Sequence, residues 1–259
     1  MDSFVFLDDN PVERGLIRQE IPEVAVPELD SDPASYARTL AAARYFEAIN
    51  FSDEDRARAE MYQANARRLS LQGQTTDLAS YLRSLEMRIV FGSFDRTTRA
   101  RVTQLINKSN QFNLTTRRCT ESQIEQLEGD PSVMTLHARL LDKFGDNGII
   151  CVAICRTTVP GIWTIDSWLM SCRVLGRSVE QAILGEILFR ARVLGITTLE
   201  GVYISTDRNE MVREHYDKLG FSRVDDGADG NSRWELRTDV ELEELPMTVQ
   251  REERHLEPA

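Results

Sequence analysis

The sequence has no apolar run of about 18–20 residues, the length that a membrane-spanning helix needs. Nor does a basic segment followed by an apolar stretch open the chain, so we expect no membrane span, no secretion signal and a cytoplasmic location. Cysteine is scarce as well, with four residues in 259, which excludes a disulfide scaffold. Cys151 and Cys155 lie in one apolar run without the flanking ligands of a zinc site.

An excess of positive charge is also missing. Lysine and arginine number 31 and aspartate and glutamate 42, for a formal net charge of −11. Nucleic-acid phosphates require clustered lysine and arginine, so this balance argues against a nucleic-acid partner. The 41% of hydrophobic residues and 28% of charged residues are typical of a soluble globular protein of one or two domains.

The first 52 residues have the pattern of part of an α/β domain. Residues 4–7 form an apolar run typical of an interior parallel strand, residues 12–20 predict a helix and residues 24–26 predict a second strand. Parallel strands need layers on both faces, so residues 1–52 alone cannot complete such a sheet. Residues 34–46 and the connector 53–85 predict helices, with Asp77 as a helix cap.

Residues 86–238 predict a mixed α/β domain, and residues 239–259 predict an acidic, solvated tail. The pattern is strand, two helices, three strands, helix, strand, helix and two strands. The expected strands are 87–91, 133–141, 148–156, 163–172, 198–204, 221–224 and 233–238, and the expected helices are 95–109, 120–127, 178–194 and 209–219.

This order resembles the acyl-CoA N-acyltransferase (GNAT) superfamily, which has a glycine-containing loop before a helix where this chain has residues 173–178. Glycine lets backbone N–H groups approach a pyrophosphate at a helix N-terminus. Ser178 stands where the superfamily has glycine or alanine. The resemblance implies that Tyr216 protonates a leaving thiolate, although a core contact also explains it. It further implies a cofactor site at Arg173, Gly176, Arg177, Ser178 and Asn209.

Four segments, residues 6–14, 106–118, 144–148 and 168–177, resemble the FkbH-like family of polyketide pathways. Its members join a haloacid-dehalogenase-type phosphatase half to an acyltransferase-like half. The resemblance implies transfer of a glyceryl group from 1,3-bisphosphoglycerate to an acyl carrier protein, whose phosphopantetheine arm, or acyl-CoA, is the expected cofactor.

The family's Asp-x-Asp nucleophile precedes the strand that residues 4–7 resemble, and only residues 1–3 stand there in this sequence. Asp8 and Asp9 resemble the family's Mg²⁺-binding acidic pair, although a polar turn explains them equally. We therefore expect no phosphatase activity from this chain alone. A separate phosphatase polypeptide, a lost gene segment or a late start site would each explain the difference.

Cys172 is the strongest catalytic candidate, because the resemblance places the end of its strand beside the thioester of the donor. Its thiol is suited to accept an acyl group, while the alternative is a small buried strand residue. His137 and His215 are candidate general bases, each with a structural alternative. The expected substrate-binding residues are Asn107, Lys108, Asn110, Arg117, Arg118, Asp146 and Asn147, which turn or helix-end chemistry also explains.

Three functions remain open from the sequence. The leading one is glyceryl transfer to a carrier protein with an incomplete phosphatase half. The second is an acyl-CoA-dependent N-acyltransferase. The third is a non-catalytic partner of a separately encoded phosphatase half, which an unpaired apolar strand at residues 4–7 favours.

Overall fold

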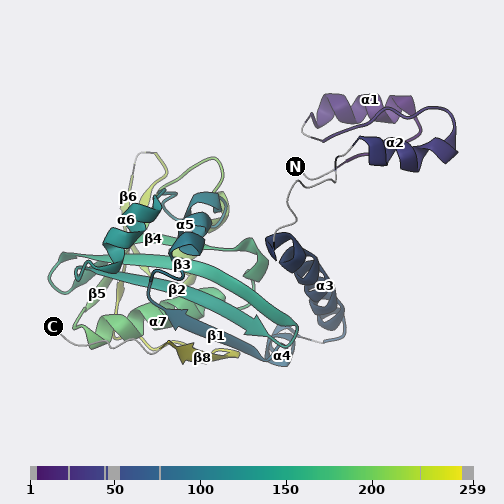
Figure 1. Ribbon diagram of the computed structural model, residues 1–259. Coiled ribbons are helices and arrows are strands. Elements are labelled where there is room, and N and C mark those ends of the chain that lie inside the picture. The colour runs from purple at the N-terminus through teal and green to yellow at the C-terminus, as the bar shows by residue number, and fades with distance from the viewer. Residues whose placement is uncertain are drawn as a thin grey trace. The chain divides into compact units, whose positions relative to one another are not determined.

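The computed structural model describes residues 5–22, 24–43, 45, 53–75, 77–227 and 229–252 (Figure 1). The chain divides into two compact units, residues 1–59 and residues 60–259. Within the described ranges, no helix has the length and apolar character needed to cross a membrane.

The described residues of the first unit include α1 (Pro11–Glu20), η1 (Pro33–Ser35), α2 (Tyr36–Ala42) and the start of α3 (Asp53–Gly73), which continues into the second unit. Helix α1 begins where expected, because the Asn10 side chain accepts the N–H of Val12. The expected pair of strands is reduced to one parallel bridge between Val5 and Ala25. The described part of this unit therefore holds no Rossmann-like sheet, since these two segments have no further strand to pair with. Phe4 and Phe46, the ends of two expected elements, lie outside the described residues.

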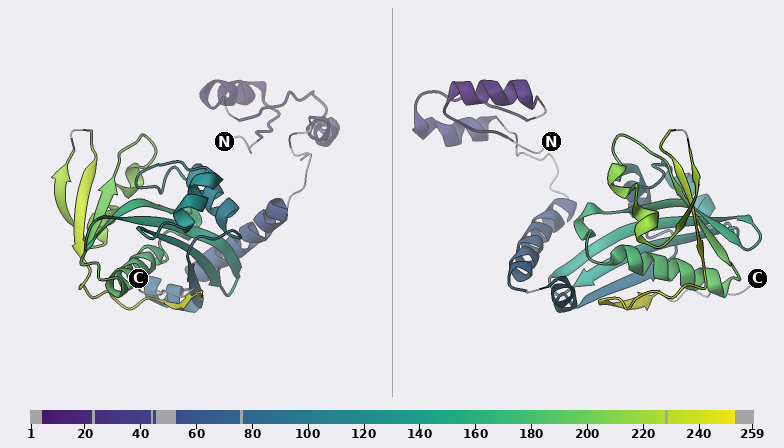
Figure 2. Two further views of the ribbon diagram at one scale, coloured as in Figure 1. Left: turned by 60° about the vertical axis from the view of Figure 1, so that its left-hand side comes forward. Right: turned by 180° about the vertical axis from the view of Figure 1, so that it is seen from behind.

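The second unit is built on one eight-stranded mixed sheet with the order β6-β7-β5-β4-β3-β2-β1-β8 (Figures 1 and 2). The neighbours β4/β5 and β1/β8 are parallel, and the other pairs are antiparallel. The strands are β1 (Met87–Gly92), β2 (Val133–Asp142), β3 (Gly145–Val159), β4 (Ile162–Met170), β5 (Thr198–Tyr203), β6 (Ser222–Asp226), β7 (Ser232–Arg237) and β8 (Met247–Arg251).

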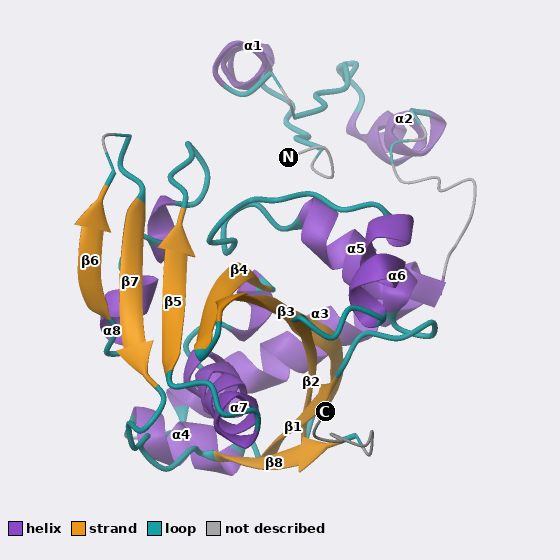
Figure 3. Cartoon of the chain, turned by 90° about the vertical axis from the view of Figure 1, so that its left-hand side faces the viewer, coloured by secondary structure: helices purple, strands orange, loops and turns teal. Residues whose placement is uncertain are grey.

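Helices cover both faces of the sheet (Figure 3). The helices of this unit are α4 (Leu78–Ser84), α5 (Arg99–Lys108), α6 (Glu121–Glu128), α7 (Val179–Val193) and α8 (His215–Lys218), together with the part of α3 from residue 60 onward and the short helical turns η2 (Cys172–Val174) and η3 (Glu210–Val212). Thr120 and Gln123 form the expected capping box at α6, and the Asp77 side chain accepts the N–H of Ser80 at α4.

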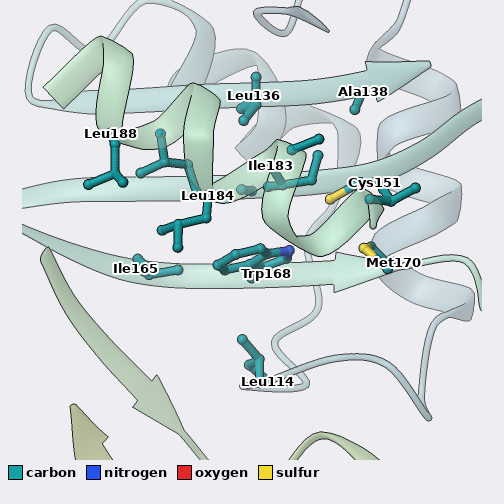
Figure 4. Packing of buried hydrophobic residues seen from close by; sticks show 14 of the residues in the cluster. Leu114, Leu136, Ala138, Cys151, Ile165, Trp168, Met170, Ile183, Leu184 and Leu188 are labelled. Carbon is teal, nitrogen blue, oxygen red and sulfur yellow. The ribbon is translucent and has the colours of Figure 1, made fainter. Parts of the chain in front are cut away.

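The core has two parts because side chains alternate along each strand. On one face, Ile183, Leu184 and Leu188 of α7 pack against Ile165 and Trp168 of β4 (Figure 4). On the other face, the buried side chains of α5 and α6 pack against the alternate residues Val152 and Ile154 of β3 and against Leu169 of β4. The order from β1 to β7 is the one expected for the GNAT fold.

Two elements differ from expectation. Residues 239–259 were expected to be a solvated tail, but β8 extends the sheet beside β1, with Met247 and Val249 packed against the core. The expected helix 209–219 is instead divided into η3 and α8. Asn209 gives η3 no side-chain cap because its amide is bonded elsewhere, as the site shows.

Candidate functional site

Cys172 lies at the end of β4, as the first residue of η2, and its side chain is exposed. Of the other cysteines, Cys151 and Cys155 are buried and Cys119 is half-buried. Burial raises the pKa of the Cys119 and Cys151 thiols, which disfavours their reactive thiolate forms. Cys172 is therefore the cysteine that a substrate can reach.

A cleft of about 670 Å³ lies beside Cys172. The C-terminal part of α5 and the residues after it form one wall, and the end of β4 and the loop after β5 form the others. The lining residues are Arg101, Gln104, Leu105, Lys108, Ser109, Asn110, Gln111, Phe112, Met170, Ser171, Cys172, Asp207 and Arg208. Two expected substrate-binding residues, Lys108 and Asn110, thus share one cleft with the candidate nucleophile.

The cleft is cationic although the chain carries a net negative charge. Arg101, Lys108 and Arg208 line it, with Asp207 as the acidic counterpart. Arg173 lies close by, and its pKa is lowered first by burial and then by the charge of Arg101. Two guanidinium groups that repel each other beside an open cleft make this edge of the sheet attractive to an anion.

A second cavity of about 470 Å³ lies against the loop that follows Cys172. Its lining is Asn65, Arg68, Leu69, Gln72, Leu78, Tyr81, Arg173, Leu175, Gly176 and Arg177. Three expected cofactor residues, Arg173, Gly176 and Arg177, therefore lie together. Gly176 has a φ of +73° and no atom near the place of a Cβ, so its backbone is open to a close approach.

Buried charges hold this loop in place. Arg68 of α3 contacts the fully buried carboxylate of Asp142 through Nε and Nη2, at 2.9 Å each. Arg177 contacts the same carboxylate at 3.4 Å and donates to the carbonyl of Arg173 at 3.1 Å. The pKa of Arg177 is lowered by burial and then by Arg68. Two cations around one carboxylate leave a surplus positive charge beside the cavity.

These features suit the phosphate end of an acyl-CoA, because guanidinium groups and an open glycine backbone bind phosphate oxygens. Ser178, the residue before α7, has a φ of +59° and gives that helix no side-chain cap. Glu180, in the first turn of α7, is an acidic group that opposes anion binding at this helix end, and burial raises its pKa.

Several expected site residues serve the fold around α5 instead of lining either cavity. The Asn107 amide donates to the Cys119 carbonyl at 2.8 Å. Arg118 donates to the carbonyl oxygens of Ile106 and Ser109 at the end of α5. Arg117 forms an ion pair with Asp166 at 2.6 Å.

The β2–β3 hairpin residues also have structural partners. Asp146 pairs with Arg139 and accepts the N–H of Gly148. Asn147 is buried and donates to the Leu140 carbonyl at 3.2 Å and to Asp142 at 3.3 Å. Asn147 thereby supports the carboxylate that holds Arg68 and Arg177.

The expected proton-transfer residues are buried and do not themselves line the cleft, although the His215 ring packs edge-on against Phe112 of its lining, with ring centroids 5.1 Å apart. His215 packs edge-on against Trp168, and burial lowers its pKa to about 3, so it is neutral at neutral pH. Tyr216 is fully buried against Gly201, and burial raises its pKa. His137 is buried near Glu252, at 3.8 Å, and burial lowers its pKa.

Asn209 is also fully buried, and its amide is bonded on both sides. It donates to the carbonyl oxygens of Asn113 and Ile204 at 2.9 Å each, and it accepts the Tyr203 hydroxyl and the N–H of Thr206. Asn209 thus holds neighbouring loops together through hydrogen bonds.

The acidic pair of the first unit does not form a complete metal site. The Asp8 carboxylate accepts the N–H of Asn10 at 2.8 Å, and Arg14 donates to the backbone carbonyls of Asp8 and Asp9. Within the described ranges, no group of three or more histidine, cysteine or acidic residues is arranged to hold a metal ion. Magnesium binding by Asp8 and Asp9 stays a prediction.

Three charged residues of the site, Arg68, Arg101 and Arg208, were not expected from the sequence. Arg101 and Lys108 lie seven residues apart on one face of α5, with Gln104 between them, so helical periodicity contained that signal. Arg68 and Arg208 come from α3 and from the loop after β5. No local pattern links either residue to the loop after Cys172.

No protein-family model and no curated protein matches this chain. Solved structures of similar fold include the ribosomal-protein-S18-alanine N-acetyltransferase of Escherichia coli, with 14% identity over 61% of this chain and 98% of that chain, at a TM-score of 0.44. Spermidine N-acetyltransferase from Vibrio cholerae, in complex with CoA and spermine, has 9% identity over 58% of this chain and 95% of that chain, also at 0.44. Both names describe N-acetyl transfer, the class of the acyl-CoA-dependent expectation. At these identities and TM-scores the likeness does not extend to activity.

Proposed function

We propose that this chain is an acyltransferase in which the Cys172 thiol takes up an acyl group and passes it to a second nucleophile. One observation carries the proposal: the exposed cysteine lies in the wall of the cationic cleft. The thiolate form of cysteine is a strong nucleophile, and a thioester is itself an activated acyl group.

The chemistry has two balanced steps. In the first, the Cys172 thiol loses its proton, its sulfur bonds to the acyl carbon of the donor, and the bond from that carbon to the leaving group breaks, with the electron pair and the proton going to the leaving group. In the second, the acceptor attacks the same carbon, the carbon–sulfur bond breaks, and the acceptor's proton passes to the released thiolate, which restores the Cys172 thiol. Neither step changes an oxidation state, so no further reactant is needed.

The cationic lining supports an anionic donor. Arg101, Lys108 and Arg208 are suited to the phosphates of an acyl phosphate. In its finer form, the proposal is transfer of the glyceryl group of 1,3-bisphosphoglycerate to the phosphopantetheine thiol of an acyl carrier protein. In this proposal, a phosphatase that the described residues do not contain removes the remaining phosphate.

A second candidate is direct transfer from acyl-CoA to an amine. The second cavity favours it, because Arg68, Arg173 and Arg177 lie beside the open backbone of Gly176, which suits the CoA phosphates. This reaction needs no covalent intermediate on Cys172. The two candidates therefore differ in what Cys172→Ser does.

The test compares the intact chain, Cys172→Ser and the matched control Cys119→Ser. Each is incubated with 1,3-bisphosphoglycerate or with acetyl-CoA, and the mass and position of any adduct are measured by mass spectrometry. Transfer to holo carrier protein and to an amine such as spermidine is then followed separately.

We expect a thioester adduct that is retained in Cys119→Ser and lost in Cys172→Ser, and transfer that falls at least about 100-fold with it. Amine acetylation that is equal in all three proteins would refute the relay through Cys172 and support the second candidate. Absence of both adduct and transfer with every donor would refute acyl transfer by this chain.

A further inference from the structure

Strands β4 and β5 begin as parallel neighbours and then diverge. They pair from Ile162 with Thr198 to Ile165 with Gly201, and the pairing ends there (Figure 3). Beyond that point, the facing backbone groups of both strands need other partners, because buried N–H and C=O groups without hydrogen bonds are costly. The space between the diverging strands is called the wedge below.

The chain fills the wedge with its own residues 112–115. Leu114 donates its N–H to the Trp168 carbonyl of β4 at 3.0 Å, and its carbonyl accepts the N–H of Ile204, just after β5, at 2.8 Å. Leu114 thus joins the two diverging strands, and its side chain is fully buried beside Trp168 (Figure 4). The bridge between Asn113 and Leu169 has the geometry of an antiparallel strand pair.

Further bonds hold this segment at both ends. The Met170 N–H donates to the Phe112 carbonyl at 3.1 Å, and the Thr115 hydroxyl donates to the Asp166 carbonyl at 3.0 Å. The buried Asn209 amide also donates to the Asn113 carbonyl, at 2.9 Å.

The bond between Met170 and Phe112 also separates the wedge from the cleft. Both residues line the cleft beside Cys172, so their bond forms part of its floor. A ligand in the cleft can approach Cys172 without breaking a bond of the wedge. A ligand entering the wedge would have to displace Leu114 and leave the carbonyl of Trp168 and the N–H of Ile204 unpaired, and displacing Phe112 as well would free the N–H of Met170.

We propose that residues 112–115 are a permanent part of the sheet, and that the thiol-bearing arm of a phosphopantetheine group approaches Cys172 through the cleft beside α5. The arm does not pass between β4 and β5. This inference rests on the proposed function of Cys172. It assigns Lys108, Gln111 and Arg208 to the sides of the path, where the cationic groups face the phosphate-bearing end of the arm.

The test uses pantethine, the disulfide of pantetheine, as the probe. The Cys172 thiolate attacks one sulfur of pantethine, the probe's S–S bond breaks, and one pantetheine thiol leaves, so the product is a mixed disulfide at Cys172. Cys172→Ser controls for modification elsewhere. Hydrogen–deuterium exchange, resolved to single amides, is measured on the full chain with and without this adduct.

We expect the amides of Leu114, Met170 and Ile204 to exchange at the same rate, within about twofold, in the free chain and in the adduct, because their bonds stay intact. We expect slower exchange for amides of residues 108–111. An increase of tenfold or more at the three wedge amides would overturn the proposal, as would failure of pantethine to modify Cys172.

A pair of variants gives a second readout. Thr115→Val removes the hydroxyl that bonds to Asp166, while Thr248→Val changes an exposed threonine of β8 as the matched control. We expect Thr115→Val to speed exchange at Leu114 without speeding adduct formation at Cys172. Faster adduct formation in Thr115→Val than in Thr248→Val would place the path in the wedge. Loss of acyl transfer with these results unchanged would refute the proposed function alone.

Discussion

Replacing Asp142 by asparagine should destabilise the second unit strongly, because one buried carboxylate serves two arginines. Asp142 has no exposed side-chain surface, and it contacts Arg68 at 2.9 Å and Arg177 at 3.4 Å. Asparagine keeps the shape but leaves two buried cations without a counter-charge. Breaking such a buried pair costs about 3–5 kcal/mol.

The same hairpin offers a matched control. Asp146 pairs with Arg139, but both side chains are partly exposed, at 34% and 53%. Water screens that pair, so we expect Asp146→Asn to cost at most about 1 kcal/mol. Arg68→Gln should fall between the two, because Asp142 then keeps Arg177 as its partner.

The assay is equilibrium unfolding in urea, followed by tryptophan fluorescence. All three tryptophans, Trp163, Trp168 and Trp234, belong to the second unit, so the signal reports that unit. With an m-value of about 3 kcal/mol/M, a loss of 3 kcal/mol lowers the urea midpoint by about 1 M. A midpoint for Asp142→Asn equal to that of Asp146→Asn would refute the reasoning.

Two further predictions concern buried positions near the sheet. Gly201→Ala should destabilise the fold by about 1–3 kcal/mol, because the added Cβ would lie 2.6 Å from the Tyr216 ring. Gly185→Ala in α7 is the matched control, since its Cβ would meet Leu242 at an ordinary 3.5 Å. We expect that variant to cost nothing or to stabilise the fold by up to about 1 kcal/mol. Urea unfolding of both variants checks this, and a larger loss at Gly185 would contradict it. For His215, burial lowers the folded-state pKa from the ordinary value of 6.5 to about 3, so the unfolded chain binds one more proton than the folded chain between these pH values. Stability should therefore fall as the pH is lowered from 6.5 toward 3, by up to about 1.4 kcal/mol per pH unit from this residue. In His215→Phe the slope of the free energy of unfolding against pH should flatten there, and an unchanged slope would contradict the assignment.

Most elements of the second unit were predictable because their signals are local. Strand alternation, the capping box at Thr120 and the cap at Asp77 each lie within a few residues. Strand β8 was not predictable in this way. Its five residues have partly exposed side chains in an acidic surrounding, and its strand conformation depends on the distant edge of β1.

The residues of the candidate site also differ in whether their signal is local in the sequence. Cys172 and the loop through Gly176 stood out from the sequence, and the structure places them against two neighbouring cavities. Arg68 could not be found, because its partner Asp142 lies 74 residues away. Asn209 resembled a ligand-binding residue, yet its amide is bonded on both sides to other parts of the chain. A sequence pattern identifies a polar residue but not whether its polar atoms remain available.

The pairing of β8 with β1 has a consequence for biosynthesis. The buried Glu186 carboxylate has Arg190 of the same helix at 2.8 Å and gains Arg251 of β8, also at 2.8 Å. At ribosomal rates of about 5–20 residues per second, β1 emerges on the order of ten seconds before β8. During that interval the nascent polypeptide carries an open strand edge that other chains can join. We therefore expect co-translational chaperones that shield such edges to increase the yield of native protein.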